Sequence, residues 1–319
     1  MPSQWELFLF GLIQFIDAPS KSPFRNYGYI SWITAFLVQT IILYRCDNSW
    51  NKKVLSVWHS FSMYFYILFG CWLIADWVDD LLPGRWTVWE AVIWGIIPAL
   101  GILKMITLRE RISWPIMAYP QSYLGLGLLP VVIYQCLWVI IACQFKGDPS
   151  PLSYLPFINP LELVQLFSII IVINWLLLIR QGVIEKMTFI NTTIGLNIMA
   201  AIAFIYITSV VAHSVHFYAG VRFDERAMLR SEVFQASISI VWTLLAFGIM
   251  WMATKKQIRK LWFVGTGLLA LVVVKLFMVD LADSGAVARI VSFITVGILM
   301  LLIGYLSPIP PKENNEITA

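Results

Sequence analysis

The sequence predicts an all-α fold, a polytopic transmembrane helical bundle of about nine spans (eight to ten). Sixty per cent of the 319 residues are hydrophobic and only 13% are charged, about half the charged fraction of a soluble domain. The mean hydropathy is +0.79. Apolar runs of roughly 20 residues recur along the chain, the length at which a helix crosses a bilayer. A membrane β-barrel would instead alternate polar and apolar residues in much shorter segments.

Three regions are expected: an N-terminal interfacial segment 1–27, a transmembrane helical domain 28–306 and a cytoplasmic tail 307–319. The apolar part of the first segment is too short to span and lacks the basic leader of a signal peptide. It is expected at the interface, or as the remnant of a span cut from a longer parent. The predicted spans are 28–45, 54–75, 87–106, 123–143, 160–179, 189–212, 233–253, 261–280 and 287–306.

Prolines and glycines mark particular points within these spans. Pro98 falls inside the third span and Pro130 inside the fourth, where a proline is expected to kink the helix because it lacks a backbone N–H. Gly265 and Gly267 lie in the eighth span, where small residues are typical of close helix packing.

Basic residues alternate from loop to loop. More than half of the 22 Lys and Arg residues fall in the loops after spans one, three, five and seven and in the tail. The positive-inside rule places these segments in the cytoplasm, with the N-terminus outside and the C-terminus inside. The net charge of +4 therefore indicates orientation and not a nucleic-acid partner. The expected partners are the lipid bilayer and other envelope membrane proteins.

Lys275 is the most informative charge in the sequence. It lies about 21 Å along the eighth span, in the outer third of the core, where an ammonium is costly unless it is compensated. Asp280 points to a different face of the same helix, so a partner on another helix is favoured, with Glu90 and Glu162 at matching depth. The side chain should lean toward the cytoplasmic end. A structural ion pair, contact with a substrate or ion, and snorkelling are the alternatives.

The segment after the eighth span predicts a tight outer hairpin. Asp283 begins a sequence, Asp-Ser-Gly, that is typical of a turn. Arg289 can pair with Asp280 or Asp283, and the favoured role of Asp283 and Arg289 is a structural ion pair.

The three histidines differ in their expected surroundings. His213 and His216 share a helix face at the outer end of the sixth span, and acidic residues follow them. A solvated helix end is the favoured interpretation, and a zinc or proton-handling site is the alternative. His59, in the cytoplasmic half of the second span, is expected to be a core histidine with satisfied polar atoms.

Glu162 stands at the start of the fifth span. Asn159 suits the N-cap, Pro160 suits the first turn, and a carboxylate there favours the helix dipole. Capping accounts for all three residues, and a binding role for Glu162 is the alternative.

Motifs that would identify an activity are absent from the sequence. It contains no phosphate loop, nucleophile elbow, haem motif or dinucleotide fingerprint. No catalytic residue, cofactor or metal is therefore assigned, and whether the protein is an enzyme stays open. The candidate binding residues form an outer-side polar layer, namely Glu90, Glu162, His213, His216, Lys275 and Asp280.

Three C-terminal segments resemble a known family. They are Val274-Lys275-Leu276-Phe277-Met278-Val279-Asp280-Leu281, Ala288-Arg289-Ile290-Val291-Ser292-Phe293-Ile294 and Gly304-Tyr305-Leu306. They resemble the C-terminal end of the bacterial polytopic membrane proteins of domain-of-unknown-function family 2339, most closely over 233–308. Members are usually longer, so the chain is expected to be a short member or a C-terminal piece. The resemblance implies a bacterial inner membrane and no known activity.

These observations favour an integral inner-membrane protein with an envelope-facing polar cavity that serves cell-envelope assembly or lipid-linked glycan handling. Two alternatives stay open. A secondary transporter of a small solute would hold its site near the midplane, between broken helices. A non-catalytic membrane scaffold would use its buried charges only to hold helices together.

Overall fold

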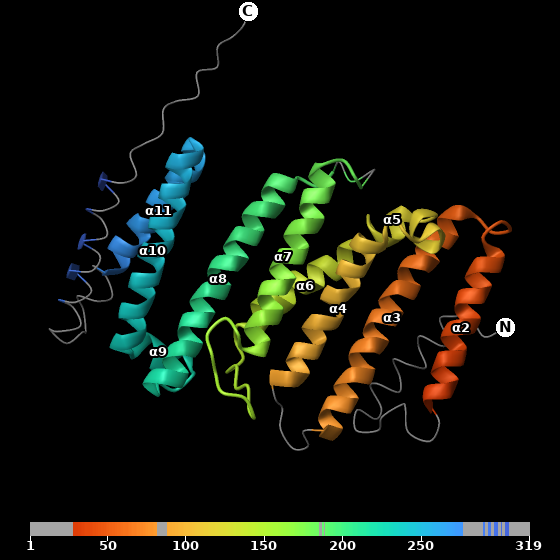
Figure 1. The fold of residues 1–319 in the computed structure, drawn as a ribbon, viewed down its shortest axis with the longest axis horizontal. Coiled ribbons are helices and arrows are strands. Elements are labelled where there is room, and N and C mark those ends of the chain that lie inside the picture. The colour runs from red at the N-terminus through yellow and green to blue at the C-terminus, as the bar shows by residue number, and fades with distance from the viewer. Residues whose placement is uncertain are drawn as a thin grey trace, which may run out of the picture. The chain divides into compact units, whose positions relative to one another are not determined.

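The computed structural model describes residues 28–81, 88–184, 187, 189–276 and a few positions between 290 and 305. All regular secondary structure in these ranges is helical (Figure 1). The predicted all-α class is therefore confirmed for the part of the chain that the structure describes.

Five of the described helices are long and apolar enough to cross a membrane. They are α3 (Lys52–Leu81), α4 (Val88–Leu108), α7 (Pro160–Arg180), α8 (Thr192–Ala219) and α10 (Glu232–Lys256). Helices α2 (Gly28–Cys46) and α11 (Arg259–Lys275) also coincide with predicted spans. The total of about nine spans and the orientation of the termini stay predictions.

The chain forms two compact units, Met1–Ile207 and Thr208–Ala319. Helix α8 begins in the first unit and ends in the second. Each unit has its own packing.

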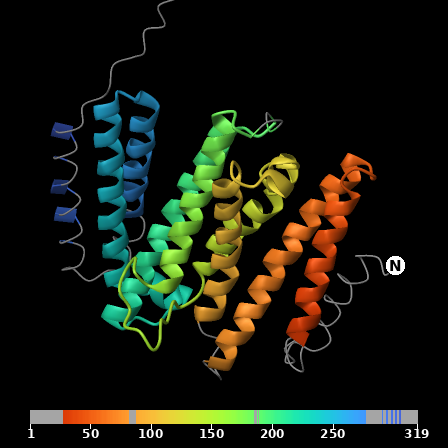
Figure 2. The same ribbon diagram turned by 45° about the vertical axis from the view of Figure 1, so that its right-hand side comes forward.

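Aromatic side chains join the first two helices of the first unit. Trp32 and Phe36 of α2 pack on Phe65 and Phe69 of α3, with ring centroids 4.6–5.9 Å apart. Helix α4 follows beside α3 (Figures 1 and 2).

Helix α7 is the most enclosed of the described membrane-length helices. It packs on α4 and α6 (Leu129–Ala142). Of the 18-residue stretch of α7 that is apolar enough to cross a membrane, 56% is buried. Trp175 is 1% exposed, and its indole donates a hydrogen bond of 2.8 Å to the Leu124 carbonyl. Any polar side chain on the buried face of α7 is thus held away from both lipid and water.

Pro98 lies inside α4, and α6 compensates for its missing N–H. A proline at this position leaves the carbonyl of Trp94, four residues earlier, without its helical donor. The Tyr134 hydroxyl of α6 donates to that carbonyl at 2.9 Å. The Gln135 amide donates to the next carbonyl, Gly95, at 3.0 Å. The interior proline therefore frees one acceptor, the Trp94 carbonyl, which ties α4 to α6.

The predicted fourth span, 123–143, is not one kinked helix. The chain forms a short π-helical turn η1 (Ser113–Met117), then α5 (Pro120–Tyr123), and α6 begins only at Leu129. Pro130 lies in the first turn of α6, where the missing N–H needs no partner. The prediction of a kink inside a span was wrong because this proline starts a helix.

The second unit is built on the hairpin of α10 and α11, joined at Gln257, whose φ of 56° is left-handed. Gly265 allows the close approach, because a Cβ there would lie 2.5 Å from Met250 Cγ and 3.0 Å from the Ala246 carbonyl. Among the described residues, a Cβ at Gly267 would meet nothing within 4 Å. The packing role predicted for these glycines is confirmed for Gly265, and for Gly267 it stays a prediction.

Candidate functional site

Glu162 is a completely buried acid in the first turn of α7, with 0% exposure. The Tyr154 hydroxyl donates to Oε1 at 2.8 Å, and the Phe157 N–H donates to Oε2 at 2.6 Å. The predicted cap is present, since Asn159 accepts from the Leu161 N–H at 2.9 Å and Pro160 follows it. Capping is therefore confirmed, and Glu162 also accepts hydrogen bonds from the loop that precedes the helix.

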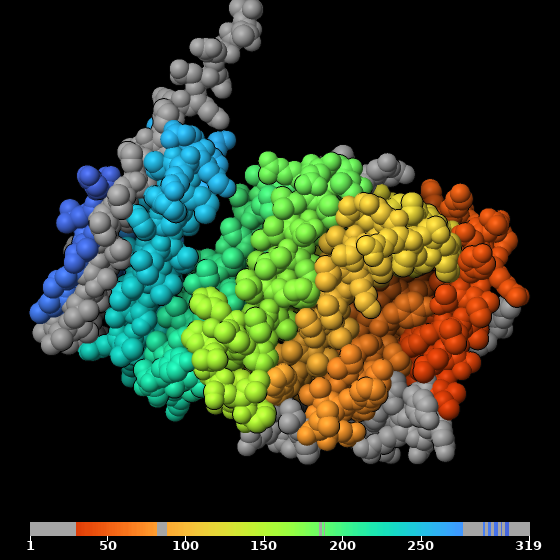
Figure 3. Space-filling view, in the orientation of Figure 1, coloured from red at the N-terminus to blue at the C-terminus, as the bar shows by residue number. Residues whose placement is uncertain are grey.

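The loop 144–159 closes over this end of α7 (Figures 1 and 3). Asn159 Nδ2 donates to the Gly147 carbonyl at 2.6 Å, and the Trp89 indole of α4 donates to the Ser150 carbonyl at 3.0 Å. Phe157 has a φ of 64°, a conformation that is strained for a bulky residue. The N–H of this same residue donates to Glu162.

A polar seam continues from Glu162 along α7. Gln165 and Ser168 follow at intervals of three residues, and both are 0% exposed. Gln165 Nε2 donates to the Val139 carbonyl at 3.1 Å. Gln135 Nε2 of α6 donates to Ser168 Oγ at 2.5 Å. These four side chains, Glu162, Gln165, Ser168 and Gln135, are called the polar seam below.

Three oxygen atoms in and beside the seam lack hydrogen-bond partners among the described residues. They are Gln165 Oε1, Gln135 Oε1 and the hydroxyl of Tyr206. Tyr206 lies on α8 and is 2% exposed. Its hydroxyl is close enough to Glu162 and Cys143 to interact with them electrostatically. Buried polar atoms are nearly always satisfied, so these atoms mark a place that can receive a ligand.

Sequence reasoning found Glu162 and missed the rest of the seam. The three-residue spacing of Glu162, Gln165 and Ser168 in the otherwise apolar first half of α7 was a usable signal, since such residues share a helix face. Gln135 and Tyr206 come from other helices, and no local pattern identified them.

Lys275, the last residue of α11, binds α10. Its Nζ donates at 2.7 Å to the Gln235 carbonyl and at 2.7 Å to Ser239 Oγ. A partner on another helix was predicted, and these contacts confirm it, although both acceptors are neutral. Lys275 and Ser239 are each 18 residues from Gln257, so Lys275 meets α10 at about its own level in the hairpin. The predicted lean toward the cytoplasmic end of α11 stays a prediction.

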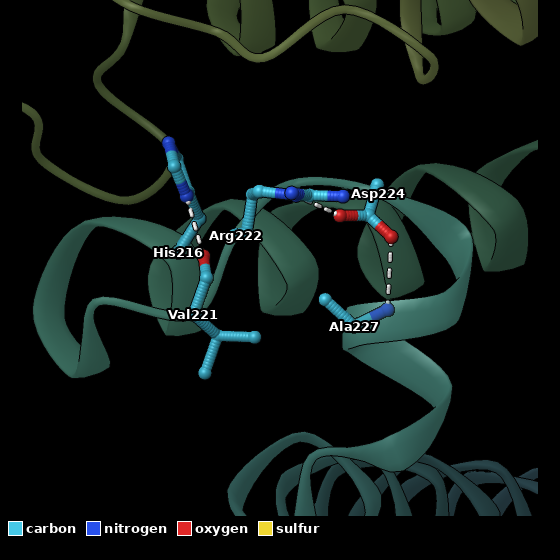
Figure 4. A network of polar contacts seen from close by, with 5 residues as sticks. All are labelled: His216, Val221, Arg222, Asp224 and Ala227. Carbon is cyan, nitrogen blue, oxygen red and sulfur yellow. Dashed lines mark hydrogen bonds and ion pairs between the residues drawn. The ribbon is translucent and has the colours of Figure 1, made fainter.

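His213 and His216 lie on α8, which extends beyond both of them to Ala219. His213 is 0% exposed, and its ring stacks on Phe223 with centroids 5.1 Å apart. His216 Nδ1 lies 2.6 Å from the Val221 carbonyl (Figure 4) and must donate there, because a carbonyl only accepts. A solvated helix end is wrong for His213, which is a core residue.

Asp224 caps the short helix α9 (Glu225–Arg230) beside this pair. It accepts from the Ala227 N–H at 2.9 Å and from Arg222 Nε (Figure 4). The Ala227 N–H and then the Arg222 hydrogen bond hold the pKa of Asp224 below its usual value. Both carboxylate oxygens thus have structural roles.

The remaining predicted residues are placed as follows. Glu90 lies half-buried in the first turn of α4 and interacts electrostatically with Asp79. Asp280, Asp283 and Arg289 lie outside the described residues. Glu90 and Glu162 belong to the first unit, whereas Lys275 and the two histidines belong to the second.

His59 is a buried core histidine, as predicted, with 0% exposure. Its Nδ1 lies 2.8 Å from the Tyr123 hydroxyl, and its ring stacks on Tyr119 at 4.2 Å. Nε2 finds no partner among the described residues, so only half of the ring is satisfied. Tyr119 donates to Asp47, and burial and this carboxylate raise the pKa of Tyr119 to about 12.

The chemistry available at the seam is binding by oxygen atoms. Among the described residues no group of three or more His, Cys, Asp or Glu side chains could hold a metal ion, so the zinc alternative for the histidines gains no support. The seam combines one carboxylate with neutral amide and hydroxyl groups, which suits a small polar or cationic ligand.

Comparison with known proteins extends the resemblance noted in the C-terminal segments. A family model described as Predicted membrane protein (DUF2339) matches residues 2–310, which is nearly the whole chain and not a C-terminal portion alone. No curated protein and no solved structure matches. The buried polar groups and membrane-length helices described above are therefore those of a membrane protein, and the chain belongs to the DUF2339 family of predicted membrane proteins.

Proposed function

We propose that this protein moves a small polar solute across the bacterial inner membrane, with the polar seam as its path from the envelope side. The observation that carries the proposal is the fully buried Glu162, followed along α7 by Gln165 and Ser168. Asn159 to Ser168 covers about 14 Å of helix, so the seam extends from the end of α7 roughly to the middle of the membrane.

The depth of the polar seam in the membrane favours transport over a reaction at the membrane surface. Polar and ionisable groups inside a membrane are costly and are typical of substrate and ion pathways. An envelope enzyme would need several acids or histidines converging in one wet pocket. The described seam contains one acid, and its other members are neutral amides and a hydroxyl.

Cell-envelope assembly with a lipid-linked glycan is the second candidate. It is favoured by the loop 144–159, which covers Glu162 and exposes three apolar side chains, Leu152, Leu155 and Ile158, at 52–63%. In the predicted orientation this loop lies at the outer interface, where a lipid-linked substrate would arrive.

Replacement of Gln165 by Leu tests the proposal. Gln165→Leu keeps the size of the side chain but blocks the seam with apolar atoms. We expect normal abundance in the membrane and loss of the ability to complement a deletion strain. Gln39→Leu is the matched control. Gln39 also donates a part-buried amide hydrogen bond, to Ser62 Oγ at 2.6 Å, but it lies on α2 and not in the seam.

The result also separates the rivals. If Gln165→Leu complements fully, the seam is not a functional path. If abundance falls in parallel with complementation, the seam is a structural element, as in a scaffold. Accumulation of a lipid-linked glycan in the deletion strain, with unchanged uptake of small solutes, would select the envelope-assembly candidate.

A further inference from the structure

The strongest unassigned feature of the molecule is the set of unsatisfied oxygens near Glu162. The orientation of the Gln165 amide is fixed, because its Nε2 donates to the Val139 carbonyl at 3.1 Å and to Cys143 Sγ at 3.3 Å. The unpartnered atom is therefore the acceptor Oε1. Exchanging the two atoms would set an oxygen against a carbonyl oxygen and leave a buried donor unpaired.

The same argument applies one step deeper. Ser168 Oγ donates to the Val164 carbonyl at 2.6 Å, so it accepts from Gln135 Nε2 at 2.5 Å. Gln135 Nε2 also donates to the Gly95 carbonyl at 3.0 Å. Its Oε1 is consequently an unpartnered acceptor as well.

Tyr206 brings a third oxygen to the same place from α8. Its ring packs at 6.4 Å from that of Phe157, the residue whose N–H binds Glu162. The hydroxyl interacts electrostatically with Glu162 and with Cys143, and Cys143 is in turn a contact of Gln165. Glu162, Gln165 and Tyr206 therefore share one buried neighbourhood.

The chemistry of this neighbourhood selects its ligand. Hard cations without a strong geometric demand prefer carboxylate, carbonyl and hydroxyl oxygens. One carboxylate among neutral oxygens supplies a single negative charge, which a monovalent ion balances and a divalent ion would exceed. We infer that Glu162, Gln165 Oε1 and the Tyr206 hydroxyl bind a monovalent alkali-metal cation, with Gln135 Oε1 as the next oxygen along the seam.

This inference rests on the proposed function, since the bound cation would be either the transported solute or an ion that is coupled to it. Transporters hold their substrates and coupling ions near the bilayer midplane, and this site lies at the outer end of the seam that leads toward it. The strained Phe157 backbone and its loop cover the site from the end of α7.

Thermal unfolding of the purified full-length protein in nanodiscs tests the site. A ligand that binds only the folded state raises the unfolding midpoint in a saturable manner. We expect NaCl or KCl to raise the midpoint relative to choline chloride at equal ionic strength. Gln165→Leu should weaken the apparent affinity at least tenfold, and Gln39→Leu should leave it unchanged.

Tyr206→Phe is a second variant, which tests the site in a protein that is expected to fold normally. It removes a hydroxyl that has no partner among the described residues, so the cation-free protein should unfold at the same temperature as the wild type or slightly higher. Only the cation-dependent rise should shrink. An equal rise in choline chloride would overturn the inference, because it would be an effect of ionic strength.

The remaining outcomes separate this inference from the proposed function. A sodium or potassium effect that Gln165→Leu and Tyr206→Phe leave intact would place the cation elsewhere and refute the site. If no cation effect is seen but Gln165→Leu still abolishes complementation at normal abundance, the proposed function stands and the cation is wrong. If Gln165→Leu complements fully, the proposed function fails whatever the cation result.

Discussion

At the scale of single residues, the described structure compensates two costly charged side chains with hydrogen-bond partners from outside their own helices. Glu162 accepts hydrogen bonds from a hydroxyl and a backbone N–H of the preceding loop. Lys275 donates hydrogen bonds to two oxygens of α10. In a membrane, water is not present to replace a missing partner. The few atoms that remain unpaired are therefore informative about ligands.

Asp224 gives a prediction about pH. Its pKa is lowered in the folded state, so the stability it contributes is present above the ordinary Asp pKa and is lost as the pH falls through the lower, folded value. We expect the wild-type unfolding temperature to decline below about pH 4. Asp224→Asn should flatten that decline, measured by thermal unfolding at several pH values. An identical pH profile for the variant would show that the cap contributes nothing.

Lys275→Met tests whether this ammonium has more than a structural role. The variant keeps the apolar stem, and the Ser239 hydroxyl that it leaves behind still donates to the Gln235 carbonyl at 3.0 Å. We therefore expect near-normal abundance in the membrane, together with loss of complementation of a deletion strain. Loss of abundance alone would refute a functional role for Lys275.

At the scale of helices, residues that weaken one helix allow or form contacts with a neighbouring helix. Pro98 removes one backbone donor from α4, and Tyr134 of α6 supplies another. Gly265 removes a side chain from α11 and lets α10 approach. In each case a residue that weakens its own helix strengthens a contact between helices.

A double-mutant cycle measures the repair at Pro98. Tyr134→Phe leaves the Trp94 carbonyl without a donor and should destabilise the protein by about 1 kcal/mol or more. In the Pro98→Ala background the helical N–H returns, so the same change should cost much less. Chemical unfolding in a defined detergent provides the four free energies. Equal costs in both backgrounds would contradict the proposed compensation.

The two glycines of α11 form a matched pair. Gly265→Ala places a Cβ against Met250 and the Ala246 carbonyl and should cost about 1–3 kcal/mol through overpacking. Gly267→Ala meets no atom of the described residues within 4 Å and should be neutral or stabilise by up to about 1 kcal/mol through helix propensity. Thermal unfolding of both variants checks the sign. Equal effects would mean that the hairpin repacks freely.

At the scale of the whole molecule, the predicted orientation in the membrane rests on the distribution of charge along the sequence. Leu155 is 52% exposed in the loop 144–159, and Gln257 is exposed at the turn of the α10–α11 hairpin. With the four native cysteines replaced, Leu155→Cys should react with a membrane-impermeant maleimide in intact cells. Gln257→Cys should react only after the membrane is opened. The reverse pattern would invert the predicted topology.

The sequence by itself determined the membrane class, the all-helical fold and the location of most helices. Apolar runs of this length must satisfy their backbone within one helix, and this is a local requirement. Caps were also local: Asn159 begins α7 as predicted. The resemblance of the C-terminal segments identified the family, which the match over residues 2–310 confirms.

Only the tertiary structure decided which polar atoms meet. It showed that Pro130 begins a helix, that His213 is buried and that Lys275 binds neutral oxygens of α10. It also assembled Gln135, Ser168 and Tyr206 around the seam that Glu162 begins. These pairings join residues tens of positions apart, and their geometry depends on how the helices pack, which hydropathy and spacing along one helix do not specify.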